Sequence, residues 1–162
     1  MPTIDYDLLT RLETIIKGLK NKKIFIAIAE SCTGGYVSNW ITNISGASKV
    51  FERGVITYSN QSKIDLLKVS ASDINDYGAV SQKIAEQMAL NIRLYSNVDV
   101  GIGITGIAGP LGGTLEKPEG LVYLGFSTKK ATCVQRYIFK TDRIRFKHQV
   151  LLKVLDFLES LI

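Results

Sequence analysis

The segment AESCTGG, residues 29–35, places reactive side chains directly after an apolar run. Gly34 and Gly35 close it, and glycines allow a backbone to approach a ligand closely. Two interpretations are open: the turn holds a nucleophile, or Ser31 or Thr33 is only the N-cap of a strand-to-helix turn. The four residues before the glycines supply one carboxylate, two hydroxyls and one thiol: Glu30, Ser31, Cys32 and Thr33.

A second glycine-rich loop, TGIAGPLGG at residues 105–113, follows another apolar run. Ligands of open α/β sheets bind outside the carboxyl ends of the strands, so these two loops form the candidate site. Their N–H groups suit a phosphate or an oxyanion. Neither loop matches the Walker pattern of nucleoside-triphosphate sites. The letters GIGITG at 101–106 match the dinucleotide pattern, but they lie within a predicted strand rather than after it.

A serine nucleophile needs a base, and no histidine lies near Ser31 in the sequence. His148, the single histidine, falls in the last predicted helix, where a surface role is expected. A desolvated lysine can serve as the base instead. The segment TYSNQSK, residues 57–63, offers Tyr58 and Lys63, although it is also typical of a solvated turn. Spacing alone does not bring Lys63 to Ser31.

Composition argues against several other functions. With Cys32 and Cys133 far apart and one histidine, no zinc site is expected. The net charge is +5, but the basic residues are scattered without interleaved aromatic residues, so nucleic-acid binding is not expected. No apolar run reaches the roughly 18–20 residues of a membrane helix, and the N-terminus has no signal pattern. We therefore expect a cytoplasmic protein with no membrane partner.

Hydrophobic spacing predicts helices and strands in alternation over the first half of the chain. The expected strands are 24–29, 50–58, 98–105 and a hairpin of 121–128 and 132–139. Three helices are expected over 4–20, 36–44 and 62–67. A fourth begins at the N-cap Ser81 and carries an apolar side of Ile84, Met88, Ile92 and Tyr95. A fifth is capped by Asp142 and carries an apolar stripe of Ile144, Leu151, Leu155, Leu158 and Ile162. Helices precede and follow the strands, which predicts a single three-layer α/β/α domain with a mixed β-sheet over residues 1–162.

Five motifs occur together in a fixed order along the chain. They are AESCTGG (29–35), RG-ITYSN-K (53–63), GAVS (78–81), TGIAGP (105–110) and KPEGLVY (117–123). This set resembles the CinA C-terminal domain family, the nicotinamide-mononucleotide deamidases, from residue 26 to about residue 145. The resemblance implies an α/β/α fold and hydrolysis of the carboxamide of nicotinamide mononucleotide to nicotinic acid mononucleotide and ammonia, a step in pyridine nucleotide recycling. It implies no metal and no organic cofactor.

The resemblance also implies roles for residues of these motifs. Ser31 would be the nucleophile, Lys63 the base and Tyr58 a supporting catalytic residue. Arg145, at the start of the last helix, would hold the phosphate. The substrate-binding set would be completed by residues of the two glycine-rich loops: Glu30, Cys32, Thr33, Gly34, Gly35, Thr105, Gly106 and Gly109.

Several questions stay open at this point. Leu111 stands where the family often has a further glycine, which would reshape the loop rim. Cys32 is a rival nucleophile, because thiols at helix N-termini ionise easily. The chain starts at this domain, so a stand-alone deamidase is expected, and a homo-oligomer is compatible with it. The alternative function is a non-catalytic nucleotide-binding or protein-interaction module with the same fold.

Overall fold

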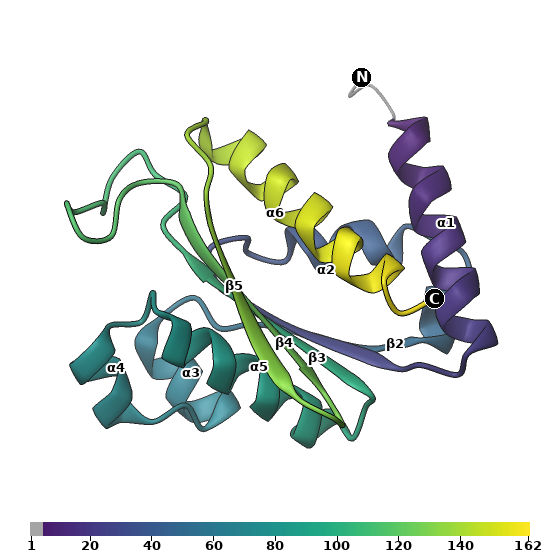
Figure 1. Ribbon diagram of the computed structural model, residues 1–162, viewed down its shortest axis with the longest axis horizontal. Coiled ribbons are helices and arrows are strands. Elements are labelled where there is room, and N and C mark those ends of the chain that lie inside the picture. The colour runs from purple at the N-terminus through teal and green to yellow at the C-terminus, as the bar shows by residue number, and fades with distance from the viewer. Residues whose placement is uncertain (1–4) are drawn as a thin grey trace.

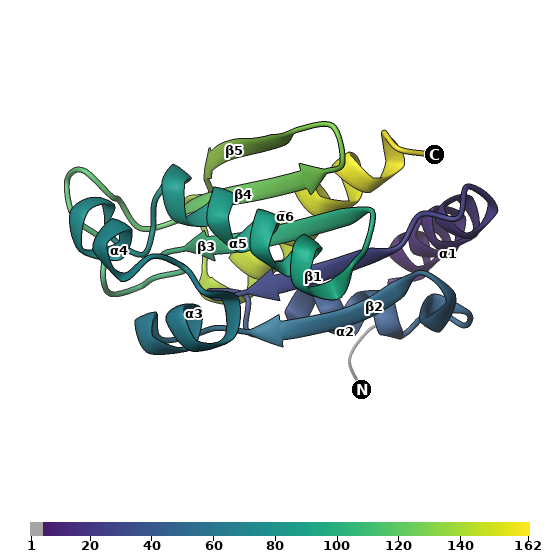
Figure 2. The ribbon, with the colours of Figure 1, turned by 90° about the horizontal axis from the view of Figure 1, so that it is seen from below.

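Five strands form one mixed sheet in the computed structural model, which describes residues 5–162 (Figure 1). The strand order is β2-β1-β3-β4-β5. Strand β1 is parallel to both β2 and β3, whereas β4 is antiparallel to β3 and β5. The three parallel strands end on the same side of the molecule (Figure 2). The strands are β1 (Ile26–Glu30), β2 (Phe51–Ile56), β3 (Val100–Gly106), β4 (Leu121–Thr128) and β5 (Thr132–Ile138).

Helices cover both faces of this sheet (Figure 1). One layer holds α1 (Tyr6–Asn21), α2 (Tyr36–Thr42) and α6 (Arg143–Glu159), and the other holds α3 (Asn60–Leu67), α4 (Ala71–Tyr77) and α5 (Gln82–Ser96). A short 3-10 helix, η1 (Ala47–Lys49), leads into β2. The α/β fold with a mixed sheet, predicted from the sequence, is confirmed.

The central strand β1 is buried on both faces, as its apolar sequence predicts. Ile26 and Ile28 belong to the core beneath α1, α2 and α6, whereas Ala27 and Ala29 belong to the core beneath α5. This alternation is the two-residue period of a strand. The strand therefore ends at a fixed depth between two cores, and the residue that follows it is held there.

Glycines on β3 and β4 admit α5 against the sheet. A Cβ built on Gly103 would lie 2.6 Å from the backbone nitrogen of Ala89, and Cβ atoms on Gly101 and Gly125 would collide with helix carbonyls. Gly101 and Gly103 of the GIGITG segment thus serve helix packing, and the segment lies within strand β3 rather than in a loop after it.

Some local predictions were wrong. Helix α4 was not predicted, because its mostly polar sequence buries one residue, Ile74. Tyr95 is exposed although its spacing placed it on the buried side of α5; that side is centred on the small residues Ala85 and Ala89, which a search for large apolar residues overlooks. Ile144 is exposed in the first turn of α6, and the buried stripe starts at Phe146. The N-caps Ser81 and Asp142 are confirmed.

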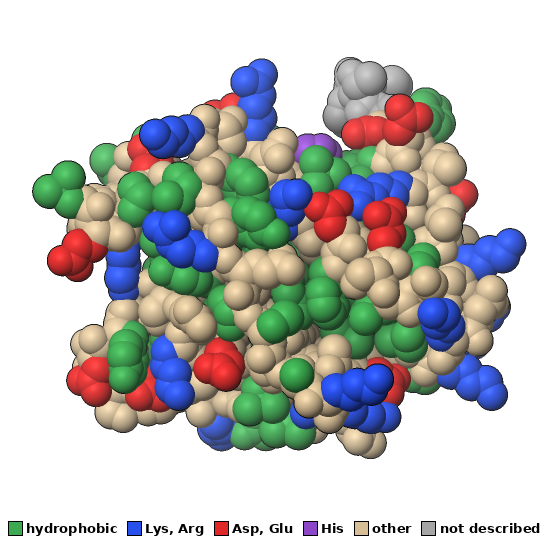
Figure 3. Space-filling model, in the orientation of Figure 1, with side chains coloured by type: hydrophobic (Ala, Val, Ile, Leu, Met, Phe, Trp, Pro, Cys, Tyr) green, Lys and Arg blue, Asp and Glu red, His purple; other side chains and the backbone are tan. Residues whose placement is uncertain are grey.

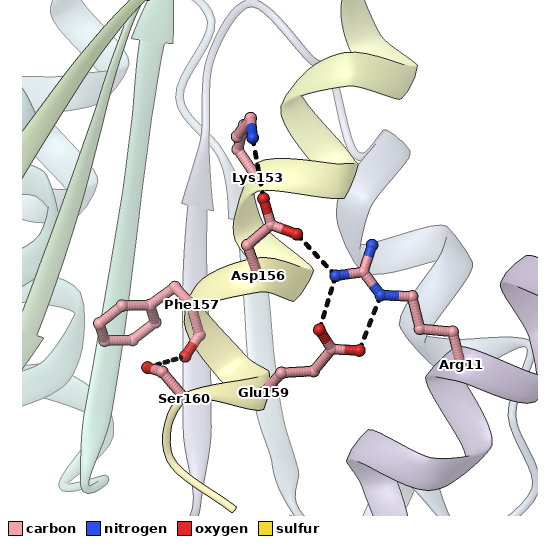
Figure 4. Close-up of polar contacts among 6 residues, drawn as sticks. All are labelled: Arg11, Lys153, Asp156, Phe157, Glu159 and Ser160. Atoms are coloured by element: carbon pink, nitrogen blue, oxygen red, sulfur yellow. Dashed lines mark hydrogen bonds and ion pairs between the residues drawn. The ribbon is translucent and has the colours of Figure 1, made fainter.

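Helix α6 is tied to α1 by a small ion-pair network (Figure 4). Arg11 donates to both carboxylate oxygens of Glu159, at 2.8 and 2.7 Å, and to Asp156 at 2.7 Å. Lys153 donates to the second oxygen of Asp156 at 2.9 Å. The groups are partly solvent-exposed, so each pair contributes at most about 1 kcal/mol. The network links α1 to α6, whose first turn borders the cavity described below.

The surface carries no concentrated cationic patch on the face drawn in Figure 3, where Lys and Arg side chains are spread among other types. Among residues 5–162, no helix is both long enough and apolar enough to span a membrane.

Candidate active site

Ser31 and Lys63 meet at the carboxyl end of the central strand. Ser31 directly follows β1, and its N–H donates to the carbonyl of Ile104 on β3 at 3.0 Å. Lys63 lies on α3, and its Nζ is 2.9 Å from Ser31 Oγ and 2.7 Å from the carbonyl oxygen of Thr57. The β1–β2 pairing explains this approach. The N–H of Thr57 donates to the backbone carbonyl of Glu30 at 2.8 Å, and α3 then folds back over the ends of the strands.

The Lys63 ammonium is removed from water. The side chain is 1% exposed, and it forms no ion pair with any residue from 5 to 162. Burial disfavours the charged form and lowers the pKa of Lys63 from its ordinary value. An amine that is more easily neutral can accept the proton of a hydroxyl, so Lys63 is placed to act as a base toward Ser31.

A cavity of about 230 Å³ opens over this pair. Its walls come from the turn after β1, the β2–α3 connection, residues 79–80, the loop after β3 and the start of α6. Thr105 is oriented by donating its hydroxyl to the carbonyl of Ala79 at 2.8 Å. Seven of the residues selected from the sequence line the cavity: Ser31, Cys32, Tyr58, Lys63, Thr105, Gly106 and Gly109.

The other selected residues of the AESCTGG segment lie outside the cavity wall. Gly34 and Gly35 adopt φ values of 61° and 90°, a region that favours glycine, and they form the turn into α2. Thr33 is fully buried, and its hydroxyl has no partner among the residues described. These residues shape the backbone around Ser31 and are not among the residues that line the cavity, so their role as substrate contacts stays a prediction.

The Glu30 side chain points to the start of α2. Its carboxylate is fully buried and accepts hydrogen bonds from the backbone N–H groups of Gly35, Val37 and Ser38 at 3.0, 3.2 and 2.8 Å. The Ser38 hydroxyl donates to it at 2.6 Å. Glu30 therefore caps the start of α2 from the end of β1, and the turn between them, which carries Ser31, is pinned at both ends.

Replacing Glu30 by alanine should lower the free energy of unfolding by about 3 kcal/mol, because three backbone N–H groups and the Ser38 hydroxyl would lose their acceptor. Urea denaturation of the two proteins measures the difference. Glu52→Ala is the matched control, since Glu52 is half exposed and pairs with its neighbour Arg53, so its loss should cost less than about 0.5 kcal/mol. Equal midpoints for the Glu30 and Glu52 variants would contradict the capping role.

The structure places Arg143, not Arg145, at the cavity. Arg143 donates to the Tyr58 hydroxyl at 2.8 Å and to the carbonyl of Gly109 at 3.0 Å. The Arg145 side chain is 80% exposed and pairs with Asp142 at 3.4 Å. Two residues apart on a helix means about 200° of rotation, so the two arginines point to different sides of α6. The sequence stretch DRIR holds both, and the spacing did not distinguish them.

The Cys32 thiol is a poor candidate for the nucleophile. It is 5% exposed, and burial raises its pKa to about 12. Helix α2 starts at Tyr36, so Cys32 does not occupy the first turn that the prediction of an activated thiol assumed. Very little thiolate is present near neutral pH under these conditions. The hydroxyl of Ser31, beside a lysine, remains the stronger nucleophile candidate.

The described part of the chain offers no candidate metal cluster, and the single histidine lies away from the Ser31–Lys63 cavity. Residues 5–162 contain no group of three or more His, Cys, Asp or Glu side chains that could hold a metal ion. His148 lies on α6, half-buried, with Nδ1 3.4 Å from the Tyr36 hydroxyl. It borders a separate surface hollow rather than the Ser31–Lys63 cavity. The chemistry available at the site is that of a hydroxyl, an amine and oriented N–H donors.

Comparison with known proteins identifies the family of this chain. The CinA C-terminal domain model matches residues 9–162. Two relatives named putative competence-damage inducible protein are 48% identical over 144 residues, in Thermoanaerobacter pseudethanolicus, and 45% identical over 150 residues, in Caldicellulosiruptor saccharolyticus. These alignments cover 89% and 93% of this chain but only 35% and 36% of the relatives, so the chain spans about a third of their length.

Solved structures share the overall fold of this chain. The competence/damage inducible protein CihA from Agrobacterium tumefaciens superposes with a TM-score of 0.93 at 32% identity, covering 99% of both chains. A CinA superfamily protein from Escherichia coli superposes with a TM-score of 0.91 at 28% identity, covering 100% of this chain and 95% of that one. The chain belongs to the CinA C-terminal domain family.

Proposed function

We propose that this chain hydrolyses the carboxamide of nicotinamide mononucleotide, giving nicotinic acid mononucleotide and ammonia. The observation that carries the proposal is the 2.9 Å separation of Lys63 Nζ and Ser31 Oγ at the base of a cavity. A buried, unpaired amine beside a serine hydroxyl is an arrangement suited to acyl transfer. The family resemblance of the five motifs supplies the substrate class.

The first half of the reaction forms a covalent intermediate. Ser31 Oγ attacks the carbonyl carbon of the carboxamide, and neutral Lys63 takes the hydroxyl proton. The tetrahedral intermediate carries a negative oxygen, which needs hydrogen-bond donors. The backbone N–H of Cys32 donates to no other residue from 5 to 162, and Cys32 lines the cavity, so this group is our assigned donor. Lys63 then returns the proton to nitrogen, the C–N bond breaks, and ammonia leaves.

The second half releases the acid. A water molecule attacks the nicotinoyl ester on Ser31, with Lys63 again accepting a proton. The ester C–O bond breaks, and Lys63 protonates Ser31 Oγ. The products are the original serine and nicotinic acid mononucleotide, whose acid proton passes to solvent or to the released ammonia to leave the carboxylate. One amine serves as acid and base in turn, which requires that its pKa lie near the working pH.

Arg143 is our assignment for the phosphate contact. Two of its N–H groups are used on Tyr58 and Gly109, and a guanidinium has five, so others remain to bind an anion. The contacts to Tyr58 and Gly109 orient the guanidinium at the cavity edge. Tyr58 is 62% exposed, so in this proposal its hydroxyl supports Arg143 at the rim.

Arg143→Ala should raise KM for nicotinamide mononucleotide by about 30-fold, since a charge-assisted contact to phosphate contributes about 2 kcal/mol. Nicotinamide riboside, which lacks the phosphate, should be turned over by both proteins with nearly equal KM. Arg145→Ala, two residues along the same helix, is the matched control and should leave both constants unchanged. A larger effect from Arg145 than from Arg143 would refute the assignment. Steady-state kinetics on both substrates decide it.

The overall proposal is tested by incubating the purified chain with nicotinamide mononucleotide. Ammonia and nicotinic acid mononucleotide should appear in equal amounts, measured by a coupled ammonia assay and by chromatography. Absence of both products from a folded chain that still binds the nucleotide would overturn the hydrolase and favour a nucleotide-binding module. Ammonia without the acid would mean a contaminating reaction.

A further inference from the structure

Leu111 lies at the mouth of the cavity with most of its surface in water. It lines the cavity and is 86% exposed. Exposed Tyr58 also lines the cavity, but its hydroxyl is held by Arg143. Apolar surface at a cavity mouth gains favourable free energy when a ligand removes it from water. Among the large apolar side chains that line this cavity, Leu111 therefore has the most exposed surface for a bound ligand to cover.

The backbone around Leu111 is held on both sides. On one side Arg143 donates to the carbonyl of Gly109, and on the other the N–H of Thr114 donates to the carbonyl of Lys117 at 2.8 Å. Between these anchors, Leu111 makes no backbone hydrogen bond with residues 5–162. The loop is therefore held on either side of Leu111, and the Leu111 side chain is left able to change rotamer over a ligand.

The cavity lining mixes polar and apolar residues. Ser31 and Lys63 form the reactive floor, and the lining also includes the apolar residues Ala79, Val80 and Ile107. If the amide carbon is at Ser31 and the phosphate at Arg143, the group that joins them spans the cavity between floor and rim. A flat aromatic ring presents a broad apolar face that Leu111 can cover, whereas a short aliphatic amide offers Leu111 little surface.

We infer that Leu111 is a specificity-determining residue that covers the aromatic ring bearing the amide, and so selects amides of aromatic heterocycles. This inference rests on the proposed function. Leu111→Ser removes the apolar contact and keeps the loop polar. It should raise the Kd for nicotinamide mononucleotide about tenfold, the size expected for losing most of a buried leucine contact.

Calorimetric titration of Ser31→Ala proteins measures binding without turnover. Leu115→Ser is the matched control, because Leu115 is on the same loop, 105% exposed and outside the cavity lining; its Kd should not change. Leu111→Met, which restores an apolar side chain, should bind within about twofold of the parent. In the active chain, Leu111→Ser should raise KM and leave kcat within about twofold, as for a contact made equally in ground and transition states.

Ribose 5-phosphate separates the ring contact from a general effect on the loop, since it has the phosphate but no ring. Its Kd should be the same for the parent and for Leu111→Ser. Equal weakening of both ligands would overturn the ring contact, and so would unchanged nucleotide binding by Leu111→Ser. If the parent protein binds no pyridine nucleotide, both the proposed function and the role of Leu111 fail. If the nucleotide binds equally well to the parent and to Leu111→Ser, only the role of Leu111 is refuted.

Discussion

Ser31→Ala should abolish ammonia release, lowering kcat by roughly 10⁴-fold or more, as expected when a covalent nucleophile is removed. The fold should survive, because the substitution loses one hydrogen bond, that to Lys63, worth about 1 kcal/mol. Ammonia release from nicotinamide mononucleotide and thermal unfolding of both proteins give the two readouts. The largest catalytic effect in the chain is thus expected from an atom whose removal hardly disturbs stability.

The control for this prediction is Ser62→Ala. Ser62 is the residue before Lys63, and its hydroxyl donates to the carbonyl of Ser59 rather than entering the cavity. It should keep activity within about twofold. Persisting activity in Ser31→Ala, sensitive to a second change at Cys32, would transfer the nucleophile to the thiol and defeat the serine mechanism. Activity insensitive to both would place the reaction outside this cavity.

Lys63→Met should reduce kcat by about 10³-fold while leaving the chain at least as stable as the parent at pH 7. A general base contributes roughly 10²–10⁴-fold, and methionine keeps the apolar stem without the amine. Stability should not fall because the buried ammonium itself is unfavourable in the folded state. Rates and urea midpoints together separate a catalytic amine from a merely structural one. Lys83→Met, at an exposed position on α5, should change neither.

The same residue predicts the direction of the pH dependence. Burial lowers the pKa of Lys63 below the unfolded value of about 10.5, so activity should rise with pH through the lowered pKa as the neutral amine forms. Between the two pKa values the unfolded chain binds more protons, and stability should therefore increase with pH across that interval. Below the folded-state pKa the full penalty of the buried charge remains. Lys63→Met should remove this contribution to the slope of unfolding free energy against pH. A slope that is unchanged in Lys63→Met would contradict the prediction.

Much of the fold could be predicted because it depends on local patterns. Buried apolar runs predicted β1 and β3, and Ser81 and Asp142 marked the starts of α5 and α6. The family motifs predicted Ser31 and Lys63, but no local pattern gave the 2.9 Å between their side chains. That distance depends on β2 pairing with β1 and on α3 folding back across the strand ends.

The remaining errors have related physical causes. Glu30 stands among reactive residues, yet its carboxylate points to the start of α2, which only the tertiary turn determines. Arg143 and Arg145 differ by rotation around α6, and their roles depend on how that helix is set against the sheet. Sequence therefore identified the chemical groups, and packing decided which of them share a cavity.

The parallel strand order also bears on when, during folding, the chain forms its cavity. Strand β1 pairs with β2 and β3 through crossover segments, and chains rich in such long-range pairings fold slowly. The cavity takes its walls from positions as far apart as Ser31 and Arg143. No early collapsed species with only local helices and hairpins contains it. Recovery of the cavity after denaturation therefore requires both the long-range strand pairings and the packing of α6, and it should lag behind the first burial of apolar surface.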